Sequence, residues 1–266
     1  MRQFIASSMP DSRGQLVLSG KDFKYLHKVL RLQPEDTIHV RLPSGALQTM
    51  SVATISSHSI NLVICHAEEN QETGVTAAEL EDSGSRSVPL WLLQFMPKAQ
   101  RMDLIVRQAT ELGVQQIIPI LGANCQKEAG HQRLDRWERV VREARQQSGS
   151  PVETRIFRPC GLTAALDLWK AAEGNTCGVA LYEKSQGTRA FHQAVAIPAP
   201  SLAGLAVGCE GGIAPDELQV LVNSGFIPVH LETNILRTET AATYGLAVLQ
   251  NLLTERKLWQ SSESNC

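Results

Sequence analysis

The chain has few aromatic residues and almost no net charge. Phe, Trp and Tyr make up 5% of its 266 residues, and 25 Lys and Arg residues face 27 Asp and Glu residues, for a formal charge of −2. Scarce aromatic rings disfavour a protein that binds nucleic acid mainly by base stacking. A net charge this close to zero does not indicate a nucleic-acid partner. A local patch of basic residues would still be compatible with one.

Long hydrophobic runs are also missing. No stretch approaches the roughly 18 apolar residues that a transmembrane helix needs. The first residues lack the apolar core of a signal peptide. We therefore expect a cytoplasmic protein that makes no membrane contact.

The six cysteines are scattered, without a C-x-x-C motif and without a histidine pair at metal-ligand spacing. We therefore expect reduced thiols and no metal ion. We expect Cys209 to behave as a small buried hydrophobic residue rather than as a nucleophile.

Composition and periodicity divide the chain into two domains and a linker. Residues 1–70 contain segments that alternate in hydrophobicity, as short strands do, at residues 15–18, 37–42, 49–55 and 60–64. A helix is predicted over residues 23–32, with Asp22 as its cap. Short strands in so few residues predict a small β-barrel. Residues 71–87 are rich in acidic residues, Gly, Ser and Thr, which is typical of a solvated linker.

From residue 88 to residue 266, strands alternate with helices. Strands are predicted at residues 90–95, 114–121, 177–182, 204–207 and 226–231, and helices at residues 101–112, 134–147, 215–224 and 238–253. This alternation predicts an α/β domain with a parallel sheet covered by helices on both faces.

The most informative segment is GCEGG at residues 208–212, between a predicted strand and a predicted helix. Glycines at such a junction let the backbone approach a ligand closely and adopt positive φ. The spacing is not G-x-G-x-x-G, so a dinucleotide-binding site is a poor match. The alternative is a glycine-rich turn that binds nothing.

A second segment, RTETA at residues 237–241, begins the last predicted helix. Arg237 and Glu239 would flank the start of this helix, beside the glycine-rich segment. The alternative is a simple cap, in which Thr238 bonds the first helical amides and Glu239 interacts with the helix dipole.

Motifs in order along almost the whole chain resemble the bacterial 16S ribosomal RNA uridine-N3 methyltransferases, of the SPOUT class of knotted methyltransferases. The matching segments are HKVLR at 27–31, KAQRMD at 98–103, QATELGV at 108–114, EA-x-x-QSG at 143–149, GCEGG at 208–212 and ILRTETA at 235–241.

The resemblance implies a fold, a cofactor and a substrate. The fold is an N-terminal PUA-like β-barrel that binds RNA, followed by an α/β domain with a deep trefoil knot, in a homodimer. The substrate is ribosomal RNA or the small ribosomal subunit, methylated at N3 of a uridine. The cofactor is S-adenosylmethionine (S-adenosyl-L-methionine), in a pocket implied to be lined by Leu181, Gly208, Gly211, Gly212, Leu231, Ile235, Leu236 and Thr238.

Uridine N3 is a poor nucleophile until its imide proton leaves, so the reaction needs a base or a cationic group. Arg237 is the candidate for stabilising charge on the flanking carbonyls. Glu239 or Glu210 is the candidate base, if burial raises its pKa, and the choice between them stays open. The enzyme must then hold the methyl group of the donor in line with the acceptor nitrogen, which requires no metal.

Contacts with RNA phosphates are expected from basic residues in both domains: Lys28, Arg31, Lys98, Arg101 and Arg107. For each residue taken singly, the alternative is an ordinary solvated side chain.

The chain departs from the family pattern at several positions. Cys209 replaces a usual Pro, Ala123-Asn124 a Glu-Arg pair, Ser150 an Arg and Glu232 a Gly. These changes keep two alternatives open: a non-catalytic RNA-binding protein of the same fold, and a related methyltransferase that acts on another RNA.

Overall fold

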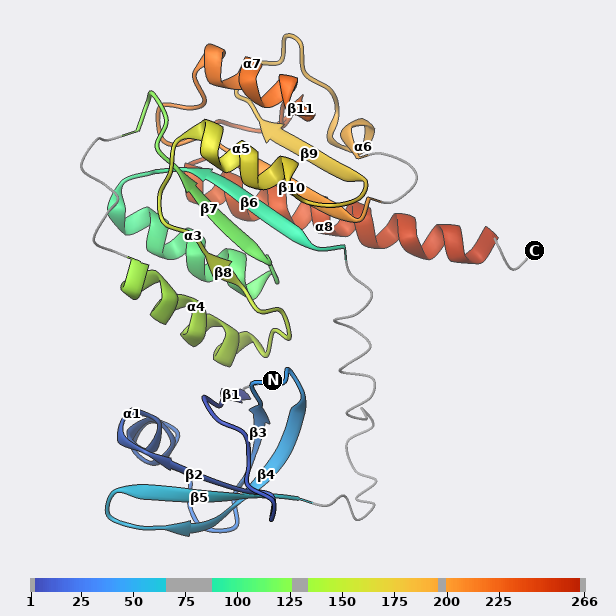
Figure 1. The fold of residues 1–266 in the computed structure, drawn as a ribbon. Helices are drawn as coiled ribbons and strands as arrows, with labels where there is room; N and C mark the ends of the chain where they lie inside the picture. The colour runs from blue at the N-terminus through green and yellow to red at the C-terminus, as the bar shows by residue number, and fades with distance from the viewer. Residues whose placement is uncertain (1–2, 66–87, 126–133, 196–199, 264–266) are drawn as a thin grey trace. The chain divides into compact units, whose positions relative to one another are not determined.

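The computed structural model describes residues 3–65, 88–125, 134–195 and 200–263 (Figure 1). The chain divides into two compact units. One comprises Met1–Ser85 with Gln146–Pro151, and the other comprises Arg86–Arg145 with Val152–Cys266. The linker predicted at residues 71–87 lies outside the described residues.

The first unit contains a mixed five-stranded sheet in the order β1-β3-β4-β5-β2. Its strands are β1 (Gln3–Ile5), β2 (Gln15–Ser19), β3 (Thr37–Arg41), β4 (Leu47–Ile55) and β5 (Ser59–Ile64). Only the β1–β3 pair is parallel. The curled sheet encloses its own apolar core, which includes Phe4, Leu26, Val40, Met50 and Leu62. Sequence analysis predicted four of these strands and missed β1.

The helix of this unit starts earlier than predicted. The α-helix α1 (Gly20–Lys24) continues into a π-helical turn, η1 (Tyr25–Val29), and Ser19 occupies the N-cap position. Asp22 is therefore inside the first turn, and its predicted role as cap is wrong. The chain leaves the helix at Arg31, whose φ of 57° is left-handed. The sequence predicted a helix over residues 23–32 because Phe23 and Leu26 are spaced as on one helix face, and both do face the core.

The second unit is an all-parallel six-stranded sheet in the order β11-β9-β10-β6-β7-β8. The strands are β6 (Leu90–Phe95), β7 (Gln116–Ile120), β8 (Arg155–Ile156), β9 (Thr176–Leu181), β10 (Leu202–Val207) and β11 (Phe226–Val229). The helices are α3 (Ala99–Glu111), α4 (Leu134–Ser148), α5 (Leu162–Lys170), α6 (Phe191–Ala194), α7 (Pro215–Asn223) and α8 (Thr238–Glu263). The last three residues of α4 belong to the first unit. The predicted α/β class is confirmed. Sequence analysis missed β8, α5 and α6, and the trefoil knot stays a prediction.

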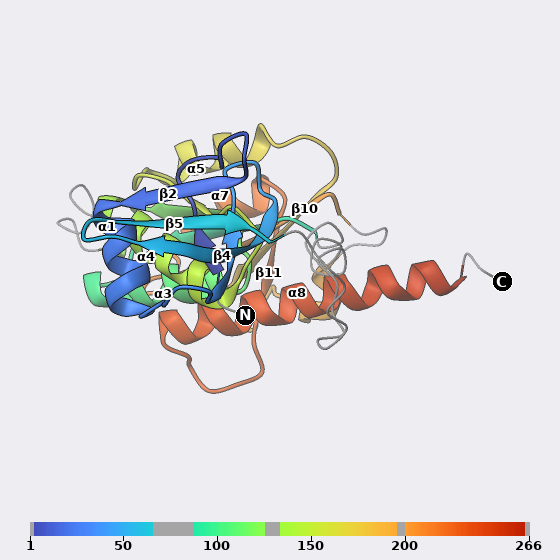
Figure 2. The ribbon, with the colours of Figure 1, turned by 90° about the horizontal axis from the view of Figure 1, so that it is seen from below.

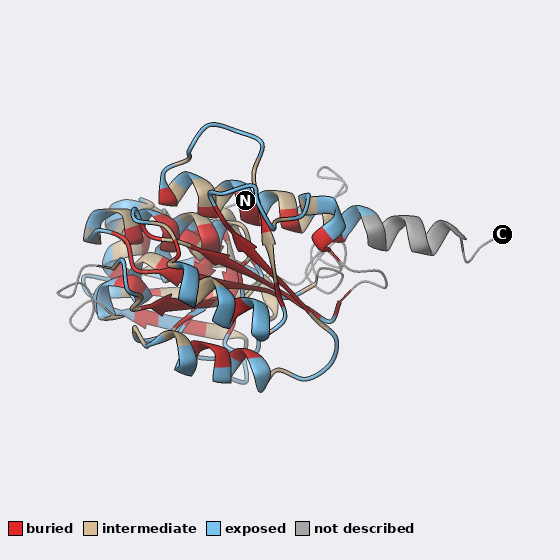
Figure 3. Cartoon of the chain, turned by 90° about the horizontal axis from the view of Figure 1, so that it is seen from above, coloured by how far each residue is buried: buried red, intermediate tan, exposed pale blue. Residues whose placement is uncertain are grey.

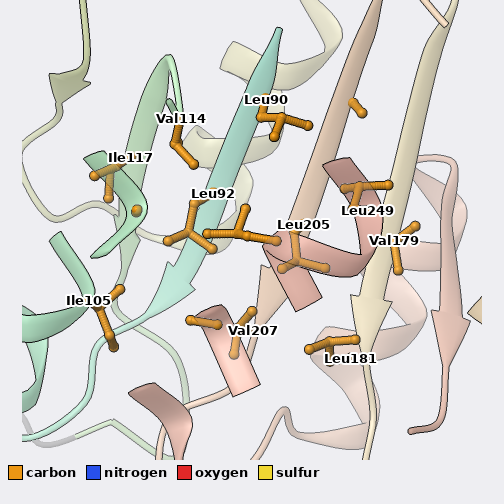
Figure 4. Close-up of a cluster of buried hydrophobic side chains, with 14 of the residues drawn as sticks. Leu90, Leu92, Ile105, Val114, Ile117, Val179, Leu181, Leu205, Val207 and Leu249 are labelled. Carbon is orange, nitrogen blue, oxygen red and sulfur yellow. The ribbon is translucent and has the colours of Figure 1, made fainter. Parts of the chain in front are cut away.

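Alternate side chains of β6 enter two cores, one on each face of the sheet. Leu90 and Leu92 join a cluster with residues of α3, α4 and α8 (Figure 4). Trp91, Leu93 and Phe95 join a second cluster with residues of α5 and α7. The strand is buried along its whole length because helices cover both faces, as the continuous apolar run predicts.

The apolar stripe of α8 is buried within its own unit. Ala242, Leu246, Leu249 and Leu253 all belong to the first of these clusters. Figure 3 shows buried segments among exposed ones along α8. The stripe thus needs no second copy to cover it, and the homodimer stays a prediction. In the described part of the chain, no helix is both long enough and apolar enough to cross a membrane.

Gly204, in the middle of β10, has no room for a side chain. A Cβ there would lie 2.6 Å from Cζ3 of the Trp169 ring. We expect Gly204→Ala to lower the free energy of unfolding by about 1–3 kcal/mol, the usual cost of overpacking a core. Denaturant titration measures this change.

Gly161→Ala is the control, because a Cβ at Gly161 meets no atom within 4 Å. Its cost should stay below about 1 kcal/mol, since it loses only the preference for glycine over alanine at a helix N-cap. Equal costs for the two variants would contradict the packing of α5 on β10.

Candidate active site at the carboxyl edge of the sheet

The parallel strands all end at one edge, where many of the predicted site residues of the second unit lie. The segments that leave β6, β7, β9 and β10 begin after Phe95, Ile120, Leu181 and Val207. In open parallel sheets, ligands bind outside the carboxyl ends of the strands. The GCEGG segment follows β10 directly and therefore lies at this edge.

The glycine loop, residues 208–212, folds tightly onto itself. The amide of Gly212 donates to the carbonyl of Cys209 at 2.9 Å. A Cβ at Gly208 would lie 2.8 Å from the carbonyl carbon of Gly212, and Gly212 itself has a φ of 72°. Both positions thus require glycine. At Gly211, a Cβ would come within 2.9 Å of the Cβ of Asn124.

Gln94 ties the loop to the neighbouring strands. Its buried amide nitrogen Nε2 lies 2.9 Å from the Phe95 carbonyl, 3.2 Å from the Val207 carbonyl and 3.3 Å from the Gly208 carbonyl. It also lies 3.1 Å from Oγ1 of Thr238. The amide oxygen Oε1 is buried and has no hydrogen-bond partner among the described residues. Sequence reasoning missed Gln94, although a lone polar residue in the run LWLLQF signals a buried group that needs partners.

Thr238 fastens the start of α8 to the same loop. Its hydroxyl donates to the Gly208 carbonyl at 2.6 Å, and the side chain is buried. The helix begins at Thr238, and the carbonyl of Arg237 accepts the bond from the Ala241 amide at 2.8 Å. Arg237 therefore occupies the cap position, and the alternative in which Thr238 caps the helix is wrong.

Three predicted residues meet in one charged cluster. Arg101, in the first turn of α3, places Nη1 3.2 Å from Oε1 of Glu210 and Nε 3.8 Å from Oε2 of Glu239. The Lys98 amide donates to Glu210 at 3.1 Å. Oε2 of Glu239 is buried and makes no hydrogen bond within the described residues. The two candidate bases thus share one guanidinium, which balances part of their charge.

The turn after β7 braces the other side of the glycine loop. Nδ2 of Asn124 donates to the Gly211 carbonyl at 2.8 Å. The amide of Ala123 donates to Oε1 of Glu217 at 2.7 Å, and the amide of Ala214 donates to Oε2 of the same residue at 3.2 Å. Asn124, one of the departures from the family pattern, therefore contacts the loop directly.

The remaining predicted cofactor residues differ in their exposure. Leu181 is buried at the end of β9, and Leu231 and Leu236 are half-buried. Ile235 is 94% exposed. The loop that carries it, between β11 and α8, projects away from the sheet (Figure 2). Arg237 is exposed at the end of this loop.

The predicted RNA contacts divide between the two units. Lys28 and Arg31 are exposed in the first unit, and Lys98 and Arg107 are exposed in the second. Arg101 differs from these four because it contacts carboxylates. Within the described residues, no group of three or more His, Cys, Asp and Glu side chains could hold a metal ion.

Comparisons with known proteins give the family. A family model described as an RNA methyltransferase domain matches residues 84–250. The chain is 30% identical to the ribosomal RNA small subunit methyltransferase E of Mycobacterium bovis over 271 positions, which cover 99% of this chain and 95% of that protein. The chain belongs to the ribosomal RNA small subunit methyltransferase E family.

Other members of the methyltransferase E family agree in sequence and in fold. The protein of Aquifex aeolicus is 30% identical, with 91% of this chain and 96% of that protein covered. The crystal structure of the methyltransferase E of Neisseria gonorrhoeae, bound to S-adenosyl methionine, matches with a TM-score of 0.76 at 25% identity. The match covers 95% of this chain and 98% of that chain. The family predicted from the motifs is confirmed.

Gln94 should stabilise the edge of the sheet at which the candidate site lies. We expect Gln94→Met to lower the free energy of unfolding by about 1–3 kcal/mol, because it leaves buried acceptors without a donor. Denaturant titration measures the loss. Gln219→Met is the matched control, since the Gln219 amide is exposed and bonds only to Asn223 among the described residues, at 3.0 Å. Equal stability of Gln94→Met and the wild type would rule out this role of Gln94.

Proposed function

We propose that this chain transfers a methyl group from S-adenosylmethionine to N3 of a uridine in 16S ribosomal RNA. The observation that carries the proposal is the tie between the glycine loop and the start of α8, made by Gln94 and Thr238. These hydrogen bonds place the backbone of the glycine loop next to Arg237 and Glu239. The names of the relatives support methylation of small-subunit ribosomal RNA, and the S-adenosyl methionine bound in the Neisseria structure supports this methyl donor.

The glycine loop suits a cofactor that is recognised through main-chain groups. Gly211 is exposed and Gly208 and Gly212 are half-buried, so main-chain groups of the loop can be reached by a ligand. Leu181, Leu231 and Leu236 supply apolar surface for the adenosine, beside Gly212 and Thr238. Ile235 would join them only after its loop moves toward the sheet. When bound, S-adenosylmethionine supplies a methyl group already activated by the sulfonium.

The side chains at the edge divide into two roles. Arg237 is exposed and free to approach the uracil carbonyls, on which negative charge develops as the N3 proton leaves. Glu239 and Glu210 are candidate proton acceptors, each held in place by Arg101. We assign Arg101 to positioning these carboxylates rather than to binding phosphate, because their charge offsets its own.

Arg237→Ala should lower kcat by about 100-fold, the scale of one lost charge-stabilising donor. The affinity for S-adenosylmethionine should change little, because the substitution leaves the backbone of the glycine loop unchanged. Single-turnover methylation and calorimetry measure the two quantities. Arg155→Ala is the control, since this exposed residue begins β8, at the amino end of the sheet. Unchanged turnover in Arg237→Ala would remove this residue from the mechanism.

We further propose that Lys28 and Arg31 of the first unit bind RNA phosphates, and that Lys98 and Arg107 of the second unit also do so. The double variant Lys28→Gln/Arg31→Gln should flatten the plot of log affinity against log salt by about 0.7–0.9 for each lost contact. Filter binding with a small-subunit rRNA fragment measures the slope. Lys170→Gln, at the end of α5, is the control. An unchanged slope would place the phosphate contacts elsewhere.

Mass mapping of RNA from cells with and without the gene tests the reaction itself. We expect one 3-methyluridine in 16S ribosomal RNA to disappear with the gene. Loss of a methyl group from a transfer RNA instead would mean a different substrate. No RNA change, together with no S-adenosylmethionine binding in calorimetry, would favour a non-catalytic RNA-binding protein.

A further inference from the structure

The start of α3 has no cap from its own residues. Lys98 occupies the N-cap position, and its side chain makes no capping hydrogen bond. In a capping box, the residue three positions later carries a carboxylate or amide that accepts a hydrogen bond from the N-cap amide. In α3 that residue is Arg101, whose guanidinium can only donate. At this position α3 therefore offers no side chain that could accept from the amide of Lys98.

The glycine loop supplies the missing acceptor. Oε1 of Glu210 lies 3.1 Å from the amide nitrogen of Lys98 and 3.2 Å from Nη1 of Arg101. Oε2 of Glu210 lies 3.4 Å from the same amide nitrogen. A carboxylate at the N-terminus of a helix also interacts favourably with the helix dipole. Glu210 thus takes the place that a glutamate of the helix itself has in a capping box.

This contact fastens a part of the loop that is also held through its main chain. Nδ2 of Asn124 donates to the carbonyl of Gly211 at 2.8 Å, and the amide of Gly212 donates to the carbonyl of Cys209 at 2.9 Å. Glu210 lies between these two carbonyls in the sequence, and its side chain joins the loop to a helix outside it. The position of the loop backbone therefore depends on the first turn of α3.

Glu210 and Glu239 differ in how their oxygens are engaged. Oε1 of Glu210 faces two donors, the amide of Lys98 and the guanidinium of Arg101. Oε2 of Glu239 is buried and accepts no hydrogen bond from the described residues, and Nε of Arg101 lies 3.8 Å from it. The contacts of Glu210 are thus those of a structural link, which leaves Glu239 as the remaining candidate proton acceptor.

We propose that Glu210 is a positioning residue, which fastens the glycine loop to the first turn of α3 and thereby sets the affinity for S-adenosylmethionine, and that it does not accept the uridine proton. This role rests on the proposed function, because it requires the cofactor to bind at this loop, whereas the contact with α3 does not. An amide oxygen at position 210 can accept from both Lys98 and Arg101, so glutamine should replace the carboxylate and alanine should not.

Calorimetry on variants of the full-length protein tests this difference. Glu210→Ala should bind S-adenosylmethionine about tenfold more weakly than the wild type, and Glu210→Gln should recover most of the affinity. Glu111→Gln is the control, because Glu111 is the exposed last residue of α3, and its affinity should equal that of the wild type. An equal loss in Glu210→Gln and Glu210→Ala would overturn the proposal. So would a fall in turnover of about 100-fold in Glu210→Gln at saturating cofactor, the scale of a lost general base.

A proline at position 98 tests the main-chain half of the contact. Lys98 has a φ of −55°, which proline can adopt, so Lys98→Pro removes the amide hydrogen without requiring a new backbone angle. Lys98→Ala removes the same side chain and keeps the amide. Lys98→Pro should bind S-adenosylmethionine about tenfold more weakly than Lys98→Ala. Equal affinities of these two variants would overturn the proposal.

Hydrogen exchange at the Lys98 amide, followed by NMR on cofactor-free protein, separates the contact from the proposed function. Exchange should be faster in Glu210→Ala than in the wild type, whereas Glu210→Gln should keep the protection. Unchanged exchange in Glu210→Ala would overturn the contact. Wild-type protein that binds no S-adenosylmethionine would contradict the proposed function and the effect on affinity, while the exchange rates still decide whether Glu210 holds the start of α3.

Discussion

The buried amide of Gln94 is the interaction on which the geometry of this edge depends. It reaches the ends of two adjacent parallel strands, β6 and β10, and the first residue of α8. Thr238 closes the same network by donating to Gly208. Because these bonds are buried, water cannot replace a lost partner, and the network holds one arrangement of the loop and helix.

This arrangement organises the charges around it. α8 starts against the glycine loop, so Arg237 and Glu239 are held close to main-chain groups that could bind a cofactor. α3 enters from the other side with Arg101, which contacts both Glu210 and Glu239. The edge therefore combines a partly exposed glycine loop with one exposed cation and two positioned carboxylates. A methyl transfer to a nitrogen that must first lose a proton needs these elements.

Much of the second unit could be predicted from sequence, because its signals are local. The apolar run at residues 90–95 is the strand β6 itself. Gly212 has the predicted positive φ, and Gly208 and Gly211 pack against other parts of the protein, while the approach of a ligand to this loop stays a prediction. Short elements were harder. β8 has two residues, too few for any periodicity, and β1 has three.

The contacts that define the site could not be predicted, since they join residues far apart in the chain. Nothing near Gln94 in sequence points to Thr238, and nothing near Arg101 points to Glu210. Local patterns also misassigned two caps, Asp22 and Thr238, because a tertiary partner or a different helix start overrode the preference of the residue type.

Backbone amide hydrogen exchange, with and without S-adenosylmethionine, tests the central claim most directly. If the cofactor binds at the carboxyl edge, exchange should slow at residues 208–213 and at residues 231–238 of the full-length protein. Protection confined to other parts of the chain, under conditions where calorimetry shows the cofactor bound, would contradict the assignment of this edge as the active site.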